Sequence, residues 1–227
     1  MFARRSLMVL ALALAIVRCA DQPTAVRQPL TPRFVRWAGN ATPQFTATRV
    51  LPSGDANKIF QTPPISLDQY SVSFWAVRGE ARSVQINYRD VGGGTTHPFL
   101  LLTTTDPALV PGLGELAPGD SVLVTVSVDT IHLGVSLEPT GLQFGAPAQM
   151  QIWYGGAGGD LNGDGLVDST DAYVEKQLLG LWYREASVNP WTPVPATQSL
   201  VDKSFTSALP HFSEYELLSL LDWVVSW

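Results

Sequence analysis

The amino-acid sequence predicts a mostly β protein, an antiparallel β-sandwich with one short helix that follows an acidic loop. Short segments of alternating apolar and polar residues recur along the chain, a pattern typical of strands with one buried face. The 19 glycines and 17 prolines supply turns between these segments. One stretch, DLNGDGLVDSTD at 160–171, concentrates side-chain oxygens and is followed by residues with helical spacing.

Composition favours one folded domain. The chain has 227 residues, of which 45% are hydrophobic and 15% charged, whereas a disordered chain would be rich in charge and poor in apolar residues. The formal net charge of −6 offers no basic surface for nucleic acid. We therefore expect no nucleic-acid partner.

The N-terminus predicts an export signal over residues 1–19. Arg4 and Arg5 precede the apolar run LMVLALALAIV at 7–17. A membrane-spanning helix needs about 20 apolar residues, so this shorter run fits a cleaved signal. Residues 20–32, which are polar and contain prolines, are expected to form a tether.

Cys19 directly follows the apolar run, in Ile16-Val17-Arg18-Cys19. This arrangement resembles the lipidation site of a bacterial lipoprotein, which implies an anchor at Cys19. The alternative is an ordinary signal peptide in which Cys19 has no role. Cys19 is the only cysteine, so no intrachain disulfide can form.

The β domain is expected over 33–217. Alternation is clearest at 70–77 (YSVSFWAV) and 83–88 (SVQINY), which a hairpin-length loop containing Gly79 connects. The remaining predicted strands are 34–37, 45–50, 99–103, 121–128, 131–137, 142–144, 149–154, 181–185, 203–208 and 211–217.

The helix is expected after the acidic loop, within an insertion over 155–180. Gly180 is expected to take the left-handed conformation that ends a helix. The apolar tail at 218–227 is expected to pack on the core, the alternative being contact with a membrane surface. The residues expected on the apolar face of the helix are Ala172, Val174, Leu178 and Leu179.

The acidic loop has the spacing of a calcium site. Calcium prefers six to eight oxygen ligands, and a twelve-residue loop supplies them from its first, third, fifth, seventh, ninth and twelfth positions, with glycine at the sixth. Gly165 occupies the sixth position, and Val167 at the eighth is expected to reach the core. The predicted Ca²⁺ ligands are Asp160, Asn162, Asp164, the carbonyl of Leu166, Asp168 through water, and Asp171.

The acidic loop has two alternatives to calcium binding. Magnesium demands tighter octahedral geometry and keeps its waters, so it suits this loop less well. A solvated Asn/Asp/Gly turn without an ion would leave four aspartates repelling one another within twelve residues. Calcium is therefore the expected ion.

The loop resembles that of an EF-hand and, more closely, that of a type I dockerin, where an aspartate also takes the twelfth position. The glycine-rich run GGAGG at 155–159 cannot form an incoming helix, because glycine costs about 1 kcal/mol per residue there. The motif is therefore a loop followed by one helix. A dockerin pairs two such repeats to bind cohesin, and the sequence contains one, so cohesin is not an expected partner.

The segments EPTGLQF at 138–144 and PAQM at 147–150 resemble the closing strands of a ZU5-type, Ig-like β-sandwich. Together with FWAVRGE at 74–80, LWYRE at 181–185, WTPV at 191–194 and HFSEY at 211–215, they resemble a family of exported bacterial proteins. The resemblance covers about residues 65–217 and implies a location at the cell envelope or outside the cell.

No enzymatic activity is expected. The sequence has neither a Gly-x-Ser-x-Gly elbow nor a His-Glu-x-x-His zinc motif. Its histidines are His97, His132 and His211, and His132 lies in a predicted strand. Among the seven tryptophans, Trp191 in Asn-Pro-Trp-Thr-Pro is expected to be the most exposed.

The sequence therefore predicts a non-enzymatic, calcium-binding β-sandwich module at the cell envelope or secreted from the cell, with an adhesion or scaffold role. The alternative is a polysaccharide-associated envelope protein that acts through the dockerin-like loop or an aromatic face. Expected partners are an envelope protein or a polysaccharide, and contact with a membrane is expected only through Cys19.

Overall fold

The computed structural model describes residues 33–39, 42–51, 60–61, 65–66, 70–89 and 94–219, all within one compact unit, Thr31–Trp227. The predicted signal at 1–19, the tether at 20–32 and most of the apolar tail lie outside the described residues. Among the described residues, no helix is long and apolar enough to cross a membrane.

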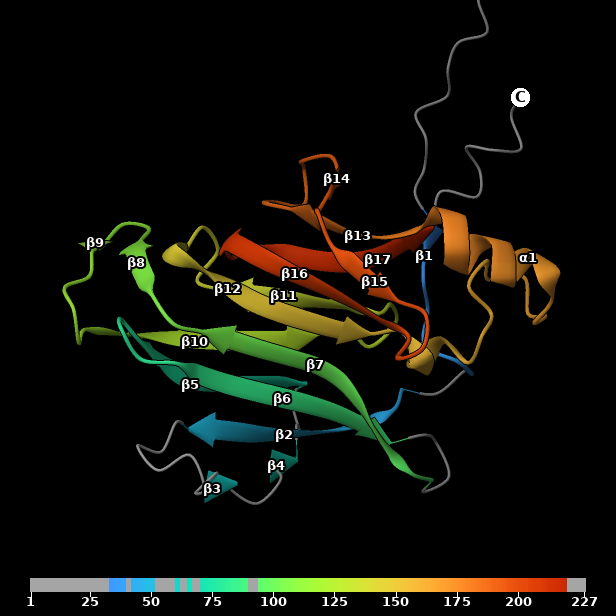
Figure 1. The fold of residues 1–227 in the computed structure, drawn as a ribbon, viewed down its shortest axis with the longest axis horizontal. Coiled ribbons are helices and arrows are strands. Elements are labelled where there is room, and N and C mark those ends of the chain that lie inside the picture. Colours follow the sequence, from blue (N-terminus) through green and yellow to red (C-terminus); the bar gives the residue numbers. More distant parts are fainter. Residues whose placement is uncertain are drawn as a thin grey trace, which may run out of the picture. The chain divides into compact units, whose positions relative to one another are not determined.

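Two antiparallel sheets confirm the predicted β-sandwich (Figure 1). In the described part of the chain, the smaller sheet has the order β14-β13-β17-β11-β10-β5, with β1 added beside β17. Its strands are β1 (Arg33–Phe34), β5 (Ser71–Val77), β10 (Ser121–Val128), β11 (Gly134–Glu138), β13 (Leu179–Arg184), β14 (Thr192–Pro193) and β17 (Glu214–Ser219).

The larger sheet has the order β15-β16-β12-β7-β6-β2-β3, with β4 beside β2, β8 beside β12, and β9 beside β8. Its strands are β2 (Gln44–Leu51), β3 (Phe60–Gln61), β4 (Ile65–Ser66), β6 (Arg82–Arg89), β7 (Thr96–Thr104), β8 (Pro107–Val110), β9 (Gly114–Glu115), β12 (Gln143–Trp153), β15 (Thr197–Ser199) and β16 (Ser204–His211).

The core forms between the inner faces of these sheets. Side chains alternate between the two faces of a strand, and in β10 every second residue is buried. Val124 pairs with Phe74 on the inner face, while Leu123 pairs with Trp75 on the outer face. One buried cluster joins both sheets and includes Phe74, Val124 and Val126 from the smaller sheet and Ile86, Leu100, Leu102, Met150 and Ile152 from the larger sheet.

Segments in which apolar and polar residues alternate strongly were predicted accurately as strands. The expected strands at 70–77, 83–88 and 121–128 match β5, β6 and β10 closely. The two predicted strands at 142–144 and 149–154 are a single strand, β12, whose register with β16 shifts between Gln143 and Ala148. The irregular pairing interrupts the alternation, and the sequence therefore indicated a break.

Two strands, β11 and β1, pair with different parts of the same edge of β17. Gly134, Val135 and Ser136 of β11 pair with the first part of β17, and β1 pairs with Leu218 and Ser219. Figure 1 shows β1 beside the end of β17. We call the point where β1 and β11 part the fork.

At the fork, the backbone of Val35 lies between Leu217 and Leu133. The Val35 N–H donates to the Leu217 carbonyl at 3.0 Å, and the Leu133 N–H donates to the Val35 carbonyl at 2.8 Å. His132 therefore lies in the loop before β11 and forms an isolated bridge with Arg36. The prediction of one strand over 131–137 was wrong at its start.

The helical insertion is shorter than predicted. Helix α1 (Ser169–Tyr173) continues into one π-helical turn, Val174–Leu178, and β13 then begins at Leu179. Gly180 does not end the helix, because it lies inside β13 and pairs with Leu218. Strand β17 ends at Ser219, beyond the predicted domain boundary at 217.

Candidate metal centre

The acidic loop connects the end of β12 to α1. A 3-10 turn, Gly155–Ala157, leads into it, and Gly158 and Gly159 adopt positive φ angles of 67° and 97°. A Cβ at Gly156 would overlap the ring of Trp37. Glycine at this position therefore lets the entrance of the loop pack against the core, and only this 3-10 turn lies between β12 and the loop.

The first half of the loop folds around its own side-chain oxygens. The two carboxylate oxygens of Asp160 accept hydrogen bonds from the backbone N–H groups of Gly163 (2.7 Å) and Gly165 (2.9 Å). The side-chain oxygen of Asn162 accepts from the Asp164 N–H at 2.9 Å. These bonds are turns that Asp and Asn side chains form with nearby backbone.

Asp171 closes the loop from the other end. Its side chain is buried, and its carboxylate accepts hydrogen bonds from the backbone N–H groups of Leu161 (2.8 Å), Asn162 (3.1 Å) and Asp168 (2.9 Å). Desolvation by burial acts to raise the pKa of Asp171, but these backbone donors more than offset it, and the pKa is lowered. Asp171 therefore stays ionised.

Asp168 serves the start of the helix. It is the N-cap of α1, and its carboxylate accepts from the Thr170 N–H at 2.7 Å. Asp168 and Asp171 together form a capping box, which satisfies backbone N–H groups that the first turn leaves free. The sequence of the loop therefore also sets where α1 begins.

Two of the three apolar residues of the loop, Leu166 and Val167, face solvent. Val167 is 68% exposed and Leu166 is 65% exposed, so the prediction that Val167 reaches the core was wrong. Leu161, at the second position, is buried instead and joins the main core cluster. Of the residues expected on the apolar helix face, Val174 is buried and Ala172 is exposed.

The donor chemistry of the loop fits a hard cation. Each carboxylate oxygen of Asp160 accepts one backbone N–H, and an oxygen with two lone pairs can still bind a cation. Asp164 uses one oxygen for the Leu166 N–H and the other for the side-chain amide of Asn162. Among the described residues, no three carboxylates of the loop place one oxygen each within 4.8 Å of one another. Binding would therefore draw these side chains further together.

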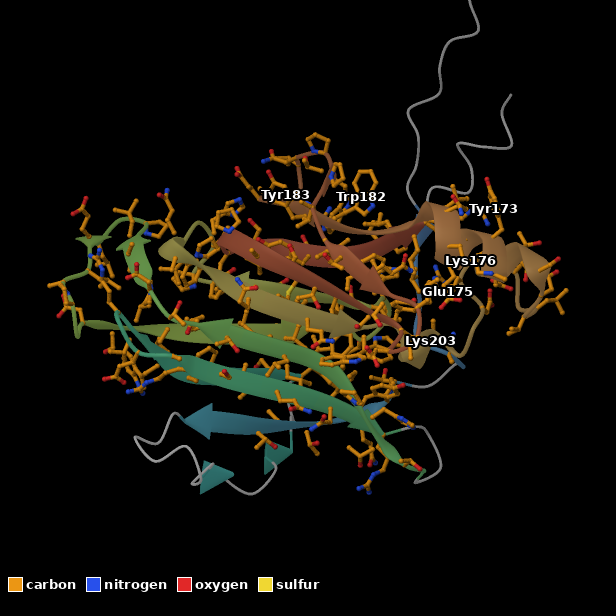
Figure 2. All side chains as sticks on the ribbon, viewed as in Figure 1. Tyr173, Glu175, Lys176, Trp182, Tyr183 and Lys203 are labelled. Carbon is orange, nitrogen blue, oxygen red and sulfur yellow. The ribbon has the colours of Figure 1, made fainter. Side chains whose placement is uncertain are left out.

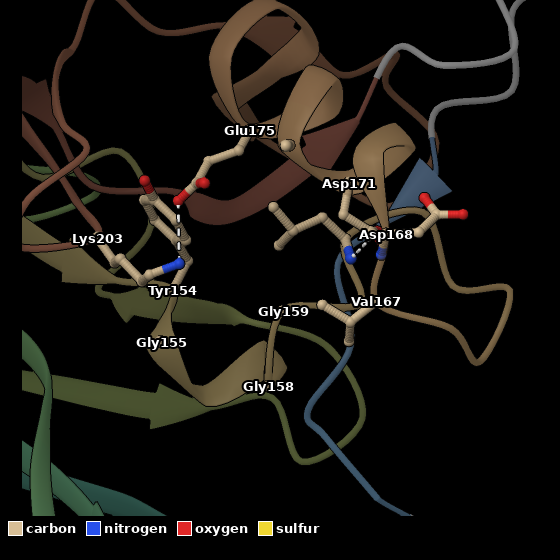
Figure 3. Close-up of a pocket in the computed structure, with 11 residues that line it drawn as sticks. Tyr154, Gly155, Gly158, Gly159, Val167, Asp168, Asp171, Glu175 and Lys203 are labelled. Carbon is tan, nitrogen blue, oxygen red and sulfur yellow. Dashed lines mark hydrogen bonds and ion pairs between the residues drawn. The ribbon is translucent and has the colours of Figure 1, made fainter.

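The loop and the helical turn after it both make polar contacts with the sandwich. The Arg33 guanidinium on β1 donates to the Asn162 carbonyl at 3.1 Å. A pocket of about 470 Å³ lies between the loop entrance and α1 (Figure 3). An ion pair between Lys203 and Glu175, 3.3 Å long, lies on one side of this pocket (Figures 2 and 3).

A second group of possible metal ligands lies at the fork. Asp129, His132 and Glu216 each have a ligand atom, and these atoms all lie within 4.8 Å of one another. No local sequence motif predicts this group, because the pairing of β11 with β17 brings Glu216 close to residues that are distant in the sequence. His132 was predicted only as a residue of a β-strand.

Comparisons with protein-family models, with curated proteins and with solved structures found no match to this chain.

Proposed function

We propose that this chain is a non-enzymatic, exported β-sandwich module whose 160–171 loop binds a structural calcium ion, and that it has an adhesion or scaffold role at the cell envelope. Export rests on the apolar run after Arg4 and Arg5, and an anchor rests on Cys19. The dockerin and ZU5 resemblances belong to this proposal.

The observation that carries the calcium proposal is the closure of the loop on itself. Side chains at its first, third, fifth and twelfth positions all accept backbone N–H groups of the same loop. These hydrogen bonds orient oxygen donors that calcium prefers. A cation would also offset the mutual repulsion of the loop aspartates.

The position of the loop supports a structural role for the ion. It carries the chain from β12 in one sheet to β13 in the other, and a glycine-rich turn precedes it. An ion that binds only the folded loop stabilises the fold by about 2.7 kcal/mol at a hundredfold excess over its dissociation constant. The ion would then hold together the link between the sheets.

Thermal unfolding in calcium and in chelator tests this role. In wild type, we expect saturating calcium to raise the melting temperature by roughly 5–10 °C relative to chelator. The double variant Asp160→Ala/Asp164→Ala should lose this increase, because it removes two side-chain ligands. Exposed Glu185 provides a matched control, and Glu185→Ala should keep the full increase. An equal melting temperature of wild type in calcium and chelator would refute the structural ion.

One observation favours the polysaccharide alternative. Trp75 on β5 is 55% exposed and lies beside Leu123, which is 46% exposed. Trp191, the tryptophan predicted to be most exposed, is only partly exposed and packs edge-on against Phe34. Ser73 and Thr125, which hydrogen-bond to each other at 2.8 Å, continue the same outer face. An aromatic ring among hydroxyl groups suits stacking on a sugar.

A glycan array distinguishes the two roles. Binding of the exported chain to a polysaccharide, with loss of that binding in Trp75→Ala, would support the polysaccharide role. Trp191→Ala is the matched control and should keep the binding. Absence of binding across the array would favour the adhesion or scaffold role.

A further inference from the structure

The side chain of Glu216, on β17, is buried. Glu216 is 3% exposed, and its Oε2 atom has no hydrogen-bond partner among the described residues. It lies on the outer face of β17, since Tyr215 and Leu217 on either side belong to the core. A buried carboxyl group without a partner is costly to ionise, so a bound cation would stabilise its charged form.

The fold makes room for this carboxylate. Gly134 of β11 is the cross-strand partner of Glu216. A Cβ at position 134 would overlap Cγ of Glu216 and lie 2.9 Å from the Tyr215 carbonyl oxygen. Only glycine at position 134 therefore leaves Glu216 in this position.

Asp129 lies near Glu216 and is held in place by hydrogen bonds. Its Oδ1 accepts the backbone N–H groups of Ile131 (2.6 Å) and His132 (2.9 Å), and its carbonyl accepts the Trp37 indole N–H at 2.8 Å. Its Oδ2 lies 3.3 Å from Nδ1 of His132. One carboxylate oxygen of Asp129 is thus used by the backbone, and the other faces the imidazole.

Aromatic rings hold the imidazole. The ring of His132 packs against Phe34 of β1 at a tilt of 35° with centroids 4.9 Å apart, and Trp191 packs edge-on against Phe34 at 5.5 Å. Phe34 pairs with Leu218 on β17, two residues from Glu216, so it lies on the same outer face. These rings reduce access of water to the group.

Arg184 is the cation that acts on Glu216, and it is shared with Glu214. The charge of Arg184 acts on Glu216, but its guanidinium forms a two-bond ion pair with Glu214 at 2.5 and 3.0 Å. It also lies 4.6 Å from the centroid of the Trp191 ring. Arg184 is therefore already engaged, and Asp129 and Glu216 remain as neighbouring acids.

We propose that Asp129, His132 and Glu216 form a binding site for a divalent transition-metal ion such as Zn²⁺. Two carboxylates and one imidazole are a ligand set that zinc accepts, with bonds of about 2.0–2.2 Å. The imidazole separates this site in chemistry from the all-oxygen loop at 160–171. Three protein ligands leave a further position for water or a partner's side chain.

Calorimetric titration of the full chain with Zn²⁺, in excess calcium to saturate the loop, tests the site. Wild type should bind about one Zn²⁺ per chain, and Glu216→Gln and His132→Phe should bind roughly tenfold more weakly or not at all. Phenylalanine at 132 keeps the ring contact with Phe34, and glutamine at 216 keeps the side-chain volume. His97→Phe is the matched control and should bind as wild type does.

Cobalt provides a second measurement. Co²⁺ bound by nitrogen and oxygen in a low-coordinate site absorbs visible light, and this absorption should appear in wild type and be absent from His132→Phe. If Glu216→Gln fails to fold, as judged by circular dichroism, His132→Phe decides the outcome. The proposal is overturned if wild type binds neither ion in excess calcium, if His132→Phe binds like wild type, or if Asp160→Ala/Asp164→Ala abolishes binding.

Discussion

The carboxylate of Asp171 accepts a hydrogen bond of 2.8 Å from the backbone N–H of Leu161. The last residue of the acidic loop is thereby joined to the second. Leu161 is part of the core cluster, so this bond connects the loop to the interior of the sandwich. Asp171 also caps α1. One side chain therefore closes the loop, anchors it and starts the helix.

Removal of this carboxylate should destabilise the protein even without calcium. In chelator, Asp171→Ala leaves three backbone N–H groups without their acceptor, two of them on buried residues. We expect a loss of about 2–5 kcal/mol in the free energy of unfolding, measured by urea denaturation. Asp168→Asn is the control and should change little, since asparagine is also a good N-cap. A loss below about 0.5 kcal/mol for Asp171→Ala would show that the closure contributes little.

Gly134→Ala should disturb the fork. The added methyl group meets both the Glu216 side chain and the Tyr215 carbonyl, so the backbones of β11 and β17 must separate. We expect a destabilisation of about 1–3 kcal/mol by chemical denaturation. Gly155→Ala is the control, because a Cβ there meets only the Tyr88 hydroxyl at an ordinary 3.6 Å. Combination with Glu216→Ala should recover part of the loss, and no recovery would mean that the Tyr215 carbonyl dominates the clash.

Ionisation of Tyr154 should lower the free energy of unfolding at alkaline pH. Burial raises its pKa to about 12, although the side-chain amide of Gln198 donates to its hydroxyl at 3.2 Å. Between pH 10 and 12 the unfolded chain ionises this tyrosine and the folded chain does not, so the contribution present below pH 10 is lost as pH rises. The expected loss is on the order of 2–3 kcal/mol.

Urea denaturation at several pH values from 8 to 12 measures this effect. Tyr154→Phe should show a shallower alkaline fall than wild type. A residual fall is expected, because burial also raises the pKa of Tyr215. Tyr173, which is 45% exposed, is the control, and Tyr173→Phe should follow wild type. Identical slopes for wild type and Tyr154→Phe would contradict the prediction.

Local patterns predicted the strands whose two faces differ. Ser121–Val128 alternates strictly, because its odd-numbered positions face outward and its even-numbered positions face the core. The apolar spacing after the loop was misleading at Leu179 and Gly180. These residues leave the helix because they pair with Ser219 and Leu218 of β17, and helical spacing along the chain carries no information about such distant partners.

The two candidate sites also differ in how far apart their residues lie in the sequence. All predicted ligands of the loop lie within twelve residues, so the spacing alone indicated calcium. The group at the fork depends on the β11–β17 register, on the space left by Gly134 and on the path of β1 between them. Burial of Glu216 results from this arrangement, and no neighbouring residue in the sequence predicts it.

Calorimetric titration with calcium tests the central claim most directly. Wild type, freed of metal by chelator and dialysis, should bind about one Ca²⁺ per chain with a dissociation constant of about 10⁻⁴–10⁻³ M, the range of extracellular calcium modules. Asp160→Ala/Asp164→Ala should show no binding, while Glu216→Gln should bind as wild type does. No calcium binding by folded wild type, or full binding by the double variant, would contradict the assignment of the ion to the 160–171 loop.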